Sequence, residues 1–369
     1  MYHVSLRSFQ PTSPAGVTEH HALISITDIT APVAAQFAAL NTAVAELTAR
    51  LQATPVFRRY FLSDAVNQRQ FIPDSDAGSV SIVGQPPLNG AKVALWIYMA
   101  TDVHVICTDN AAVMSHNGYS HLYHTQMQAP EQPDSFAETD TILRHYAAEL
   151  DDCGCTLLEN CIRTWIYVHD IDSNYAGMVQ ARRQFFEEHG LTPQTGYIAS
   201  TGIEGRSASR HVRVLIDACG LLGAAPAQLR HLHAPTHLNP THEYGVTFER
   251  GASIDYGDRR HIFISGTASI DNTGNVVHTG DVLRQTHRTL ENISALLADA
   301  DATTADIMFL LVYLRDIADC HSVEQYLATC FPEIPRLMLL APVCRPQWLV
   351  EMECIAIKTI EKSNSFTDF

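Results

Sequence analysis

Three charged side chains in one stretch of the sequence have types and a spacing that can do chemistry. Arg336 opens an apolar run, and Glu351 and Glu353 lie in a second apolar run beyond a proline-containing break. If the two runs are strands joined by a tight turn, Arg336 lies opposite Glu351, because antiparallel partners are equidistant from the turn. Side chains alternate along a strand, so Glu351 and Glu353 share a face. The sequence therefore predicts a hairpin with a guanidinium beside two carboxylates.

Such a pair has two interpretations. Arg336 offers a planar fork of donors that matches a substrate carboxylate. Glu351 can then move a proton or orient a water molecule. The alternative is a structural ion pair at a sheet edge, and spacing alone favours it, because ion pairs are common and catalytic pairs are rare.

The residues around this pair resemble the Rid (reactive intermediate deaminase, YjgF) superfamily. The resemblance covers about residues 240–357 and rests on the segments 261–270, 280–292, 312–317 and 335–351. It implies that Arg336 grips a substrate carboxylate and that Glu351 activates or places water. The segment SGTASI and the HTGDV that follows it also resemble the chorismatase branch of the superfamily.

Two positions depart from the Rid pattern. Met338 stands two residues after Arg336, where the family has a small residue or Cys, and Phe248 stands where the family has Tyr. Residues 163–167 resemble a chorismatase strand that helps to shape the pocket, although core packing is the alternative for Trp165 and Tyr167. The residues predicted to contact the substrate are Arg336, Phe248, Met338, Glu353, Tyr167 and Arg163.

Composition limits the class of protein. A chain of 369 residues, 46% hydrophobic and 17% charged, predicts a folded protein with more than one core. No apolar run is long enough to span a membrane, and residues 1–14 lack a signal-peptide core, so we expect a cytoplasmic protein that does not contact membranes. The net charge of −16 repels phosphate backbones, which argues against nucleic-acid binding.

Cysteine and histidine spacing predicts no metal site. Nine Cys without regular spacing indicate reduced, mostly buried thiols rather than disulfides. Residues 229–244 contain four His, but no helical i, i+4 pair and no acidic third ligand accompany them, so this segment is predicted to be a surface linker. The tail from Lys358 is predicted to be disordered.

The first part of the chain, residues 1–110, is predicted to be an additional α/β segment. Residues 37, 40, 44, 47 and 51 are apolar and form one helical face. Strands are predicted on either side of this helix and just beyond the segment, at 20–30, 56–62, 79–84, 93–99, 103–108 and 121–127.

The remainder contains an internal repeat with a shift of 146 residues, which aligns Tyr167 with Tyr313 and Phe185 with Phe331. The predicted fold class is therefore α+β, with tandem Rid or chorismate-mutase-like (ferredoxin-like βαβ) sandwiches. The copy at 111–225 is predicted to be degenerate, and the copy at 235–360 to carry the site. At the places of Arg336 and Glu351, the degenerate copy has about Ser200 and Leu215.

Four functions are compatible with these residues. The first is a cofactor-independent hydrolase that removes ammonia from a carboxylate-bearing imine or enamine. The second is a chorismatase-like enzyme, with Glu351 as proton donor to the enolpyruvyl ether and pyruvate as product. The third is a non-catalytic module that binds a small carboxylate, and the fourth is an endoribonuclease, which the acidic charge disfavours. The resemblance also implies a homotrimer with clefts between subunits.

Overall fold

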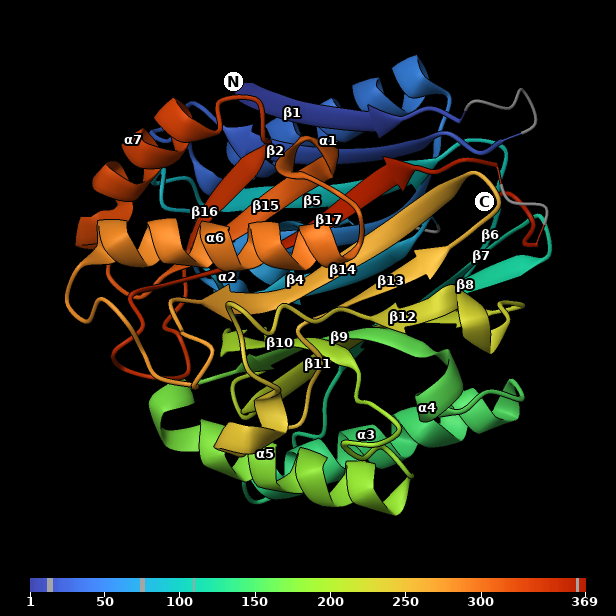
Figure 1. The fold of residues 1–369 in the computed structure, drawn as a ribbon. Helices are drawn as coiled ribbons and strands as arrows, with labels where there is room; N and C mark the ends of the chain where they lie inside the picture. The colour runs from blue at the N-terminus through green and yellow to red at the C-terminus, as the bar shows by residue number, and fades with distance from the viewer. Residues whose placement is uncertain (12–15, 74–76, 109, 363–364) are drawn as a thin grey trace.

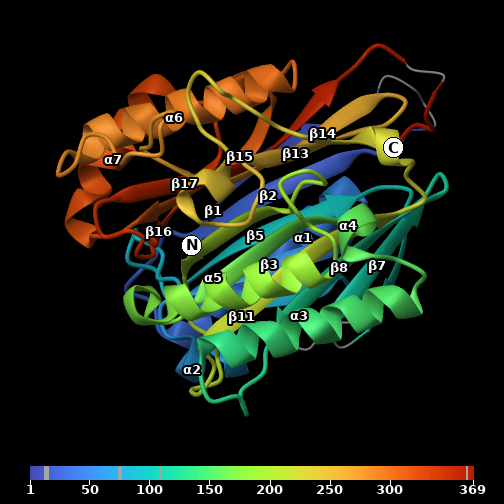
Figure 2. The ribbon, with the colours of Figure 1, turned by 60° about the horizontal axis from the view of Figure 1, so that its bottom comes forward.

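Three mixed β-sheets, each with helices on its outer face, make up the structure (Figure 1). The computed structural model describes residues 1–11, 16–73, 77–108, 110–362 and 365–369. We call the parts of the chain that build the three sheets the first, second and third units. In Figure 1 and Figure 2 the sheets face one another at the centre, and the helices lie on the periphery.

The first unit builds a sheet in the order β1-β2-β5-β3-β4, in which only β3 and β4 run parallel. Its elements are β1 (Tyr2–Phe9), β2 (Glu19–Ile26), α1 (Val33–Leu51), β3 (Thr54–Leu62), α2 (Ala65–Gln68), η1 (Arg69–Phe71), β4 (Ser79–Val83) and β5 (Val93–Ala100). Helix α1 buries its predicted apolar face, including Phe37, Leu40 and Leu47, against this sheet.

The second unit builds a sheet in the order β10-β9-β11-β8-β7-β6, with β9 and β10 parallel. Helices α3 and α5 pack side by side on its outer face (Figure 2). Its elements are β6 (His104–Cys107), β7 (Ala111–His116), β8 (Tyr119–Met127), α3 (Ser135–Asp152), α4 (Leu157–Asn160), β9 (Cys161–Val168), α5 (Ile171–Glu188), β10 (Ala199–Glu204) and β11 (Val214–Leu222).

The third unit builds a sheet in the order β12-β13-β14-β17-β15-β16, with β15 and β16 parallel. Helices α6 and α7 cover it. Its elements are η2 (Pro226–Gln228), β12 (Leu229–His231), η3 (Thr241–Tyr244), β13 (Gly251–Asp255), β14 (Arg259–Ala268), α6 (Val282–Asp299), η4 (Thr304–Asp306), β15 (Ile307–Leu314), η5 (Ile317–Asp319), α7 (Cys320–Cys330), β16 (Arg336–Leu340) and β17 (Val350–Thr359).

The α+β sandwich fold is confirmed, and the N-terminal α/β segment has the same topology as the other two units. The orders β1-β2-β5-β3-β4, β7-β8-β11-β9-β10 and β13-β14-β17-β15-β16 are equivalent. Thr164 pairs with Ser200 as Leu310 pairs with Arg336, so β9 and β15 are offset by the predicted 146 residues, whereas β10 and β16 are offset by 136. One chain therefore contains three equivalent sheets.

Buried ion pairs join each unit to the next. A buried charge is stable only when it is paired, so removing one partner of such a pair is costly. The pairs are Arg59 Nη2 with Asp217 Oδ2 at 2.9 Å, Arg163 Nη2 with Glu353 Oε2 at 2.5 Å, and Arg259 Nη1 with Glu19 Oε1 at 2.6 Å. These contacts fix the three sheets relative to one another.

The expectation of a disordered tail is wrong for the last five residues. Phe369 is fully buried, its ring lies 4.7 Å below the guanidinium of Arg259, and its backbone N–H donates to Asp258 Oδ1 at 2.9 Å. Ser363 and Asn364, which belong to the same predicted tail, lie outside the described residues. Aromatic burial over a paired cation explains why this segment is ordered.

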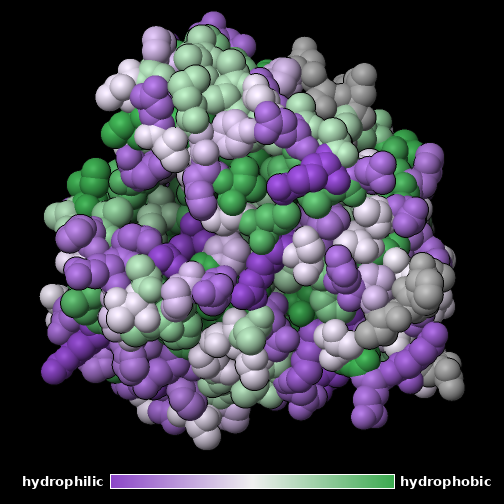
Figure 3. Space-filling view, turned by 90° about the horizontal axis from the view of Figure 1, so that it is seen from above, coloured by the Kyte–Doolittle hydropathy of each residue, from purple (hydrophilic) through white to green (hydrophobic). Residues whose placement is uncertain are grey.

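Hydrophilic residues make up most of the face seen in Figure 3, with smaller apolar patches among them. No helix among the described residues is both long and apolar enough to cross a bilayer.

Candidate active site

Glu351 is a buried acid at the start of β17. Its side chain packs over Gly266 of β14 so closely that a Cβ on that glycine would lie 2.2 Å from Oε1. Burial, and then the charge of Glu353, raises the pKa of Glu351 to about 8. Only 5% of Glu351 is exposed, and no described residue forms a hydrogen bond with its carboxyl group. At neutral pH Glu351 is therefore mainly a neutral acid that can donate a proton.

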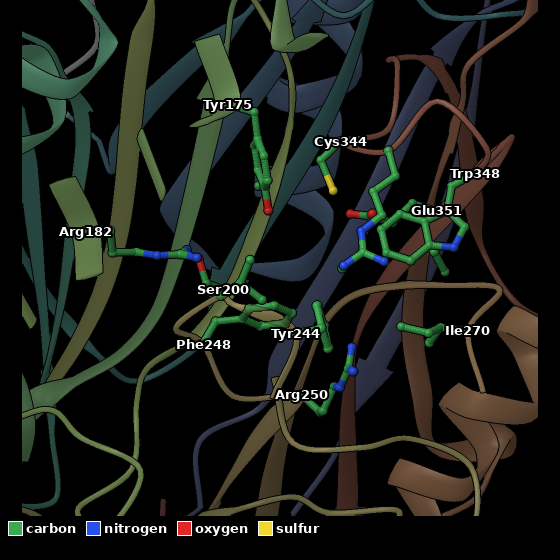
Figure 4. A pocket seen from close by; sticks show the side chains of 15 residues that line it. Tyr175, Arg182, Ser200, Tyr244, Phe248, Arg250, Ile270, Cys344, Trp348 and Glu351 are labelled. Carbon is green, nitrogen blue, oxygen red and sulfur yellow. The ribbon is translucent and has the colours of Figure 1, made fainter. Parts of the chain in front are cut away.

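The carboxyl group of Glu351 faces a narrow cavity of about 50 Å³ between the second and third units (Figure 4). The second unit contributes α5 and β10. The third unit contributes β14, β17 and two irregular segments, 244–250 and 341–349. The side chains that matter most for chemistry are Glu351, Arg182, Arg250, Arg345, Tyr175, Tyr244, Phe248, Cys344, Trp348 and Ser200.

Three arginines surround this cavity. Arg182 of α5 is 2% exposed, and its Nη1 lies 3.5 Å from Ser200 Oγ, whereas its buried Nε has no hydrogen-bond partner among the described residues. A hydrogen bond fixes the side chain of Arg250, because its Nη2 donates to the backbone oxygen of Asn239 at 3.1 Å. Arg345 forms no ion pair with any residue that the structure describes. Together the three guanidiniums make the cavity suitable for a ligand with more than one negative charge.

Aromatic rings contact all three of these arginines, and the guanidinium of Arg182 lies 5.9 Å from the ring centre of Phe248. The guanidinium of Arg345 lies 4.9 Å from the ring centre of Tyr244 and 4.8 Å from that of Trp348. The guanidinium of Arg250 lies 5.2 Å from the Tyr244 ring. Trp348 is itself fixed, because its Nε1 donates to the backbone oxygen of Ser269 at 2.9 Å. Cation–π contacts use no hydrogen-bond donors, so the donors of Arg345 remain available to a ligand.

Cys344 and Tyr175 complete the wall beside Glu351. Burial, and then the nearby Glu351, raises the pKa of Cys344 to about 12. Burial and the neighbouring thiol also raise the pKa of Tyr175 well above its usual range. Both side chains are therefore neutral at physiological pH, and Cys344 lacks the thiolate character of a nucleophile.

The predicted hairpin between Arg336 and Glu351 is wrong. Strand β16 pairs in parallel with β15, and β17 pairs with the other edge of β15, so β15 separates the two residues. The connection 341–349 crosses from one side of β15 to the other instead of forming a tight turn. Arg336 instead forms an ion pair with Glu324 of α7, with Nη2 and Oε1 2.7 Å apart. Arg336 thus lies outside the cavity.

Of the other residues predicted to bind substrate, only some line the cavity in the described structure. Phe248 lines the cavity. Met338 packs beside the first unit, where its backbone oxygen accepts a hydrogen bond from the Leu88 N–H at 3.0 Å. Tyr167 is fully buried, and its hydroxyl has no partner. Met338 and Tyr167 therefore do not contribute to the cavity.

Glu353 and Arg163 also lie outside the cavity, in a buried network between the second and third units. Besides its ion pair with Arg163, Glu353 accepts hydrogen bonds from Tyr313 Oη at 3.0 Å and from Trp165 Nε1 at 3.1 Å. A fully paired carboxylate of this kind is unavailable to a substrate. Its charge nevertheless raises the pKa of Glu351.

The strand registers explain which residues meet at the cavity. Glu351 pairs with Tyr313 as Leu215 pairs with Tyr167, so Leu215 is confirmed as the counterpart of Glu351. Ser200 is likewise the counterpart of Arg336. Because the cavity lies between units, Glu351 faces Ser200 of the second unit and not Arg336 of its own unit. Arg182, Arg250 and Arg345 supply the positive charge there.

Comparison with known proteins identifies the family. The profile of the endoribonuclease L-PSP family matches residues 253–358. The 3-aminoacrylate deaminase RutC of Acinetobacter baylyi is 33% identical over 97 residues, which are 26% of this chain and 77% of that protein. This chain belongs to the endoribonuclease L-PSP family, within the Rid superfamily. A RutC family protein of Pyrococcus abyssi is 37% identical over 100 residues, which are 26% of this chain and 78% of that protein.

The fold of this L-PSP family chain resembles a solved structure over a greater length. A crystal structure of chorismatase superposes with a TM-score of 0.64, covering 82% of this chain and 93% of that one, at 20% identity. At this identity the likeness shows the fold alone. It extends the similarity well beyond residues 253–358.

Metal ligation has little support in the parts of this L-PSP family chain that the structure describes. No group of three or more His, Cys, Asp or Glu side chains there is arranged to hold a metal ion. In the linker 229–244, His231 lies beside Glu249, with Nδ1 and Oε1 4.0 Å apart.

Proposed function

We propose that this chain hydrolyses an enol ether of a small dicarboxylic acid and releases pyruvate, with chorismate as the substrate that tests the proposal. The observation that carries the proposal is a protonated Glu351 in a cavity with three guanidiniums. The chorismatase-like fold supports it, because that likeness covers 82% of this chain and so extends beyond the residues 253–358 that the family profile matches.

The charges around the cavity favour a dianion. Arg182, Arg250 and Arg345 carry positive charge, and the neutral form of Glu351 does not offset it. Two carboxylates can therefore be bound by charge-assisted hydrogen bonds. A monocarboxylate would leave a buried guanidinium unpaired, which costs free energy.

The proposed reaction uses Glu351 as a general acid. Its proton moves to the methylene carbon of the enolpyruvyl group, and the resulting oxocarbenium ion is attacked by water. The hemiketal then releases its ether oxygen as an alcohol, and pyruvate forms. One proton of the attacking water returns to Glu351, and the other goes to the alcohol. The net reaction consumes one water molecule and needs no cofactor. General acid catalysis of this kind accelerates reactions by about 10²- to 10⁴-fold.

The cavity must widen for this reaction. A volume of about 50 Å³ accepts water but not an acid the size of chorismate. The segment 341–349, which carries Arg345 and Trp348, is neither helix nor strand. We infer that it moves outward when the substrate enters.

A second candidate function is removal of ammonia from an enamine or imine acid. Family membership favours it, because a relative that is 33% identical is named 3-aminoacrylate deaminase. Here one arginine would bind the single carboxylate and Glu351 would handle the proton or water. This function leaves two of the three guanidiniums without a role.

The test incubates the purified chain with chorismate and measures pyruvate. In parallel, ammonia is measured with imines generated in solution. Pyruvate release that is lost in Glu351→Gln and retained in Arg336→Ala supports the proposal, since Arg336 lies outside the cavity. Ammonia release without pyruvate supports the deaminase. Chorismate that raises the melting temperature without turnover indicates a binding module instead.

A further inference from the structure

A second, larger cavity of about 890 Å³ lies where the carboxyl ends of the three parallel strand pairs converge. The pairs are β3 with β4, β9 with β10, and β15 with β16. Helix α2 and strand β16, which contribute lining residues to this cavity, lie in the left half of the molecule in Figure 1 and Figure 2. Crevices beyond the carboxyl ends of parallel strands are common ligand sites. This cavity takes no part in the proposed hydrolysis.

The three units contribute different side chains at equivalent positions of this cavity. Ser63, His169 and Arg315 each follow directly after the first strand of a parallel pair. The cavity is therefore asymmetric in chemistry although its framework is threefold. Its volume falls in the range of sites for small molecules.

Several charges in this cavity are already satisfied. Arg315 forms an ion pair with Asp172. Glu204 accepts hydrogen bonds from the backbone N–H groups of Asp170 at 3.1 Å and Ile171 at 2.7 Å, at the start of α5. These groups fix the wall: the Arg315–Asp172 pair is neutral, whereas Glu204 keeps one negative charge that backbone donors hold in place.

Three other charges lack an ionic partner within the described part of the chain. Arg206 is anchored through its backbone to Gly84 of the first unit, with hydrogen bonds of 2.7 and 3.2 Å, but its guanidinium has no partner. Asp170 has a left-handed backbone with φ of 50°, and its carboxylate does not cap α5. Asp64 accepts hydrogen bonds only from Asn67. The cavity thus presents one cation and two carboxylates that have no ionic partner among the described residues.

We propose that this cavity binds a basic amino acid, which has one carboxylate and two ammonium groups. Arg206 pairs with the ligand carboxylate, and Asp64 and Asp170 pair with the two ammonium groups. Charge complementarity of this kind selects against diamines, which leave Arg206 unpaired, and against neutral amino acids, which leave one aspartate unpaired.

The test is calorimetric titration of the full chain with L-lysine as the probe. Saturable binding to one site per chain is expected, with cadaverine and 6-aminohexanoate each at least about fivefold weaker because each lacks one charge pair. Equal affinity for cadaverine and L-lysine overturns the role of Arg206. Absence of saturable heat at millimolar L-lysine overturns the site itself.

Variants separate this site from non-specific charge effects. Arg206→Ala and Asp170→Asn are expected to weaken L-lysine binding by about fivefold or more, whereas Arg210→Ala, an exposed arginine outside the cavity, retains it. Equal loss in all three variants contradicts the proposal. Both cavity variants should leave pyruvate release from chorismate unchanged, so failure here is distinguishable from failure of the proposed function.

Discussion

Glu351 and Glu353 stand on the same strand, β17, yet only Glu353 has a cationic partner. Glu353 Oε2 lies 2.5 Å from Arg163 Nη2, whereas no guanidinium lies within ion-pair distance of Glu351 in the described chain. Burial, and then the charge of Glu353, raises the pKa of Glu351 to about 8. Glu351 is therefore mainly protonated at neutral pH, in a cavity that Glu353 does not line.

This difference predicts a pH-dependent stability. The folded chain keeps Glu351 protonated up to about pH 8, whereas the unfolded chain releases that proton near 4.5. The contribution of Glu351 to the free energy of unfolding is therefore greatest at low pH, and it decreases as the pH rises from about 4.5 to 8. Glu351→Gln removes the decrease, so the variant should exceed the parent in free energy of unfolding by an amount that grows with pH, at most on the order of 5 kcal/mol at pH 9. Urea unfolding at pH 5 and pH 9 measures it, and an equal difference at both pH values contradicts the assignment.

Gly266→Ala should displace the acid. Its Cβ would lie 2.2 Å from Glu351 Oε1, so one of the two must move. We expect kcat for pyruvate release to fall by about tenfold or more, because catalytic groups tolerate little displacement. Gly202→Ala is the matched control, since its Cβ would meet nothing closer than 3.4 Å at the same cavity. Similar kcat values for the two variants would show that the Glu351 position is not critical.

Arg345→Ala should weaken substrate binding more than it weakens folding. The guanidinium is held by Tyr244 and Trp348 and has no ion pair in the described chain, so its removal leaves no buried charge unpaired. We expect KM for chorismate to rise by about tenfold or more, with a smaller loss for Arg345→Lys. Steady-state kinetics of both variants provide the measurement. An unchanged KM would exclude Arg345 from carboxylate binding.

Asp217→Asn should loosen the contact between the first and second units. Arg59 and Asp217 are both fully buried, so the substitution leaves an uncompensated guanidinium and should cost about 3–5 kcal/mol of stability. Glu188→Gln removes a surface partner of Arg144 and should cost less than about 1 kcal/mol. Denaturant unfolding compares them. A cost for Asp217→Asn as small as that of the control would mean that the buried pair does not join the units.

Much of the fold was predictable from hydrophobic periodicity. The strands 56–62 and 93–99 and the helix face on α1 follow from local pattern, which the structure retains as β3, β5 and α1. The shared topology of the first unit was missed. A signal existed, because Asp64 follows β3 at the same position as Asp170 follows β9 and Asp316 follows β15.

The site was predictable only in part. Glu351 and Phe248 were correctly expected at the cavity. The two apolar runs on either side of the break are compatible with a hairpin and also with two strands on either side of β15. The sequence therefore did not show that Arg336 lies away from Glu351. Arg182, Arg250 and Arg345 were missed because they meet only across the contact between units, which no local pattern reveals. The counterpart relation between Ser200 and Arg336 could have indicated that Glu351 faces the second unit. The cytoplasmic location and the homotrimer stay predictions, although three sheets already meet within one chain.

The most direct test of the central claim is pyruvate release from chorismate, measured from pH 6 to pH 10 for the parent chain and Glu351→Gln. Because Glu351 acts as an acid, the parent rate should fall as pH rises through about 8, and the variant should be slower by about 10²-fold or more. A parent chain that releases no pyruvate, or a variant that matches it, contradicts the account.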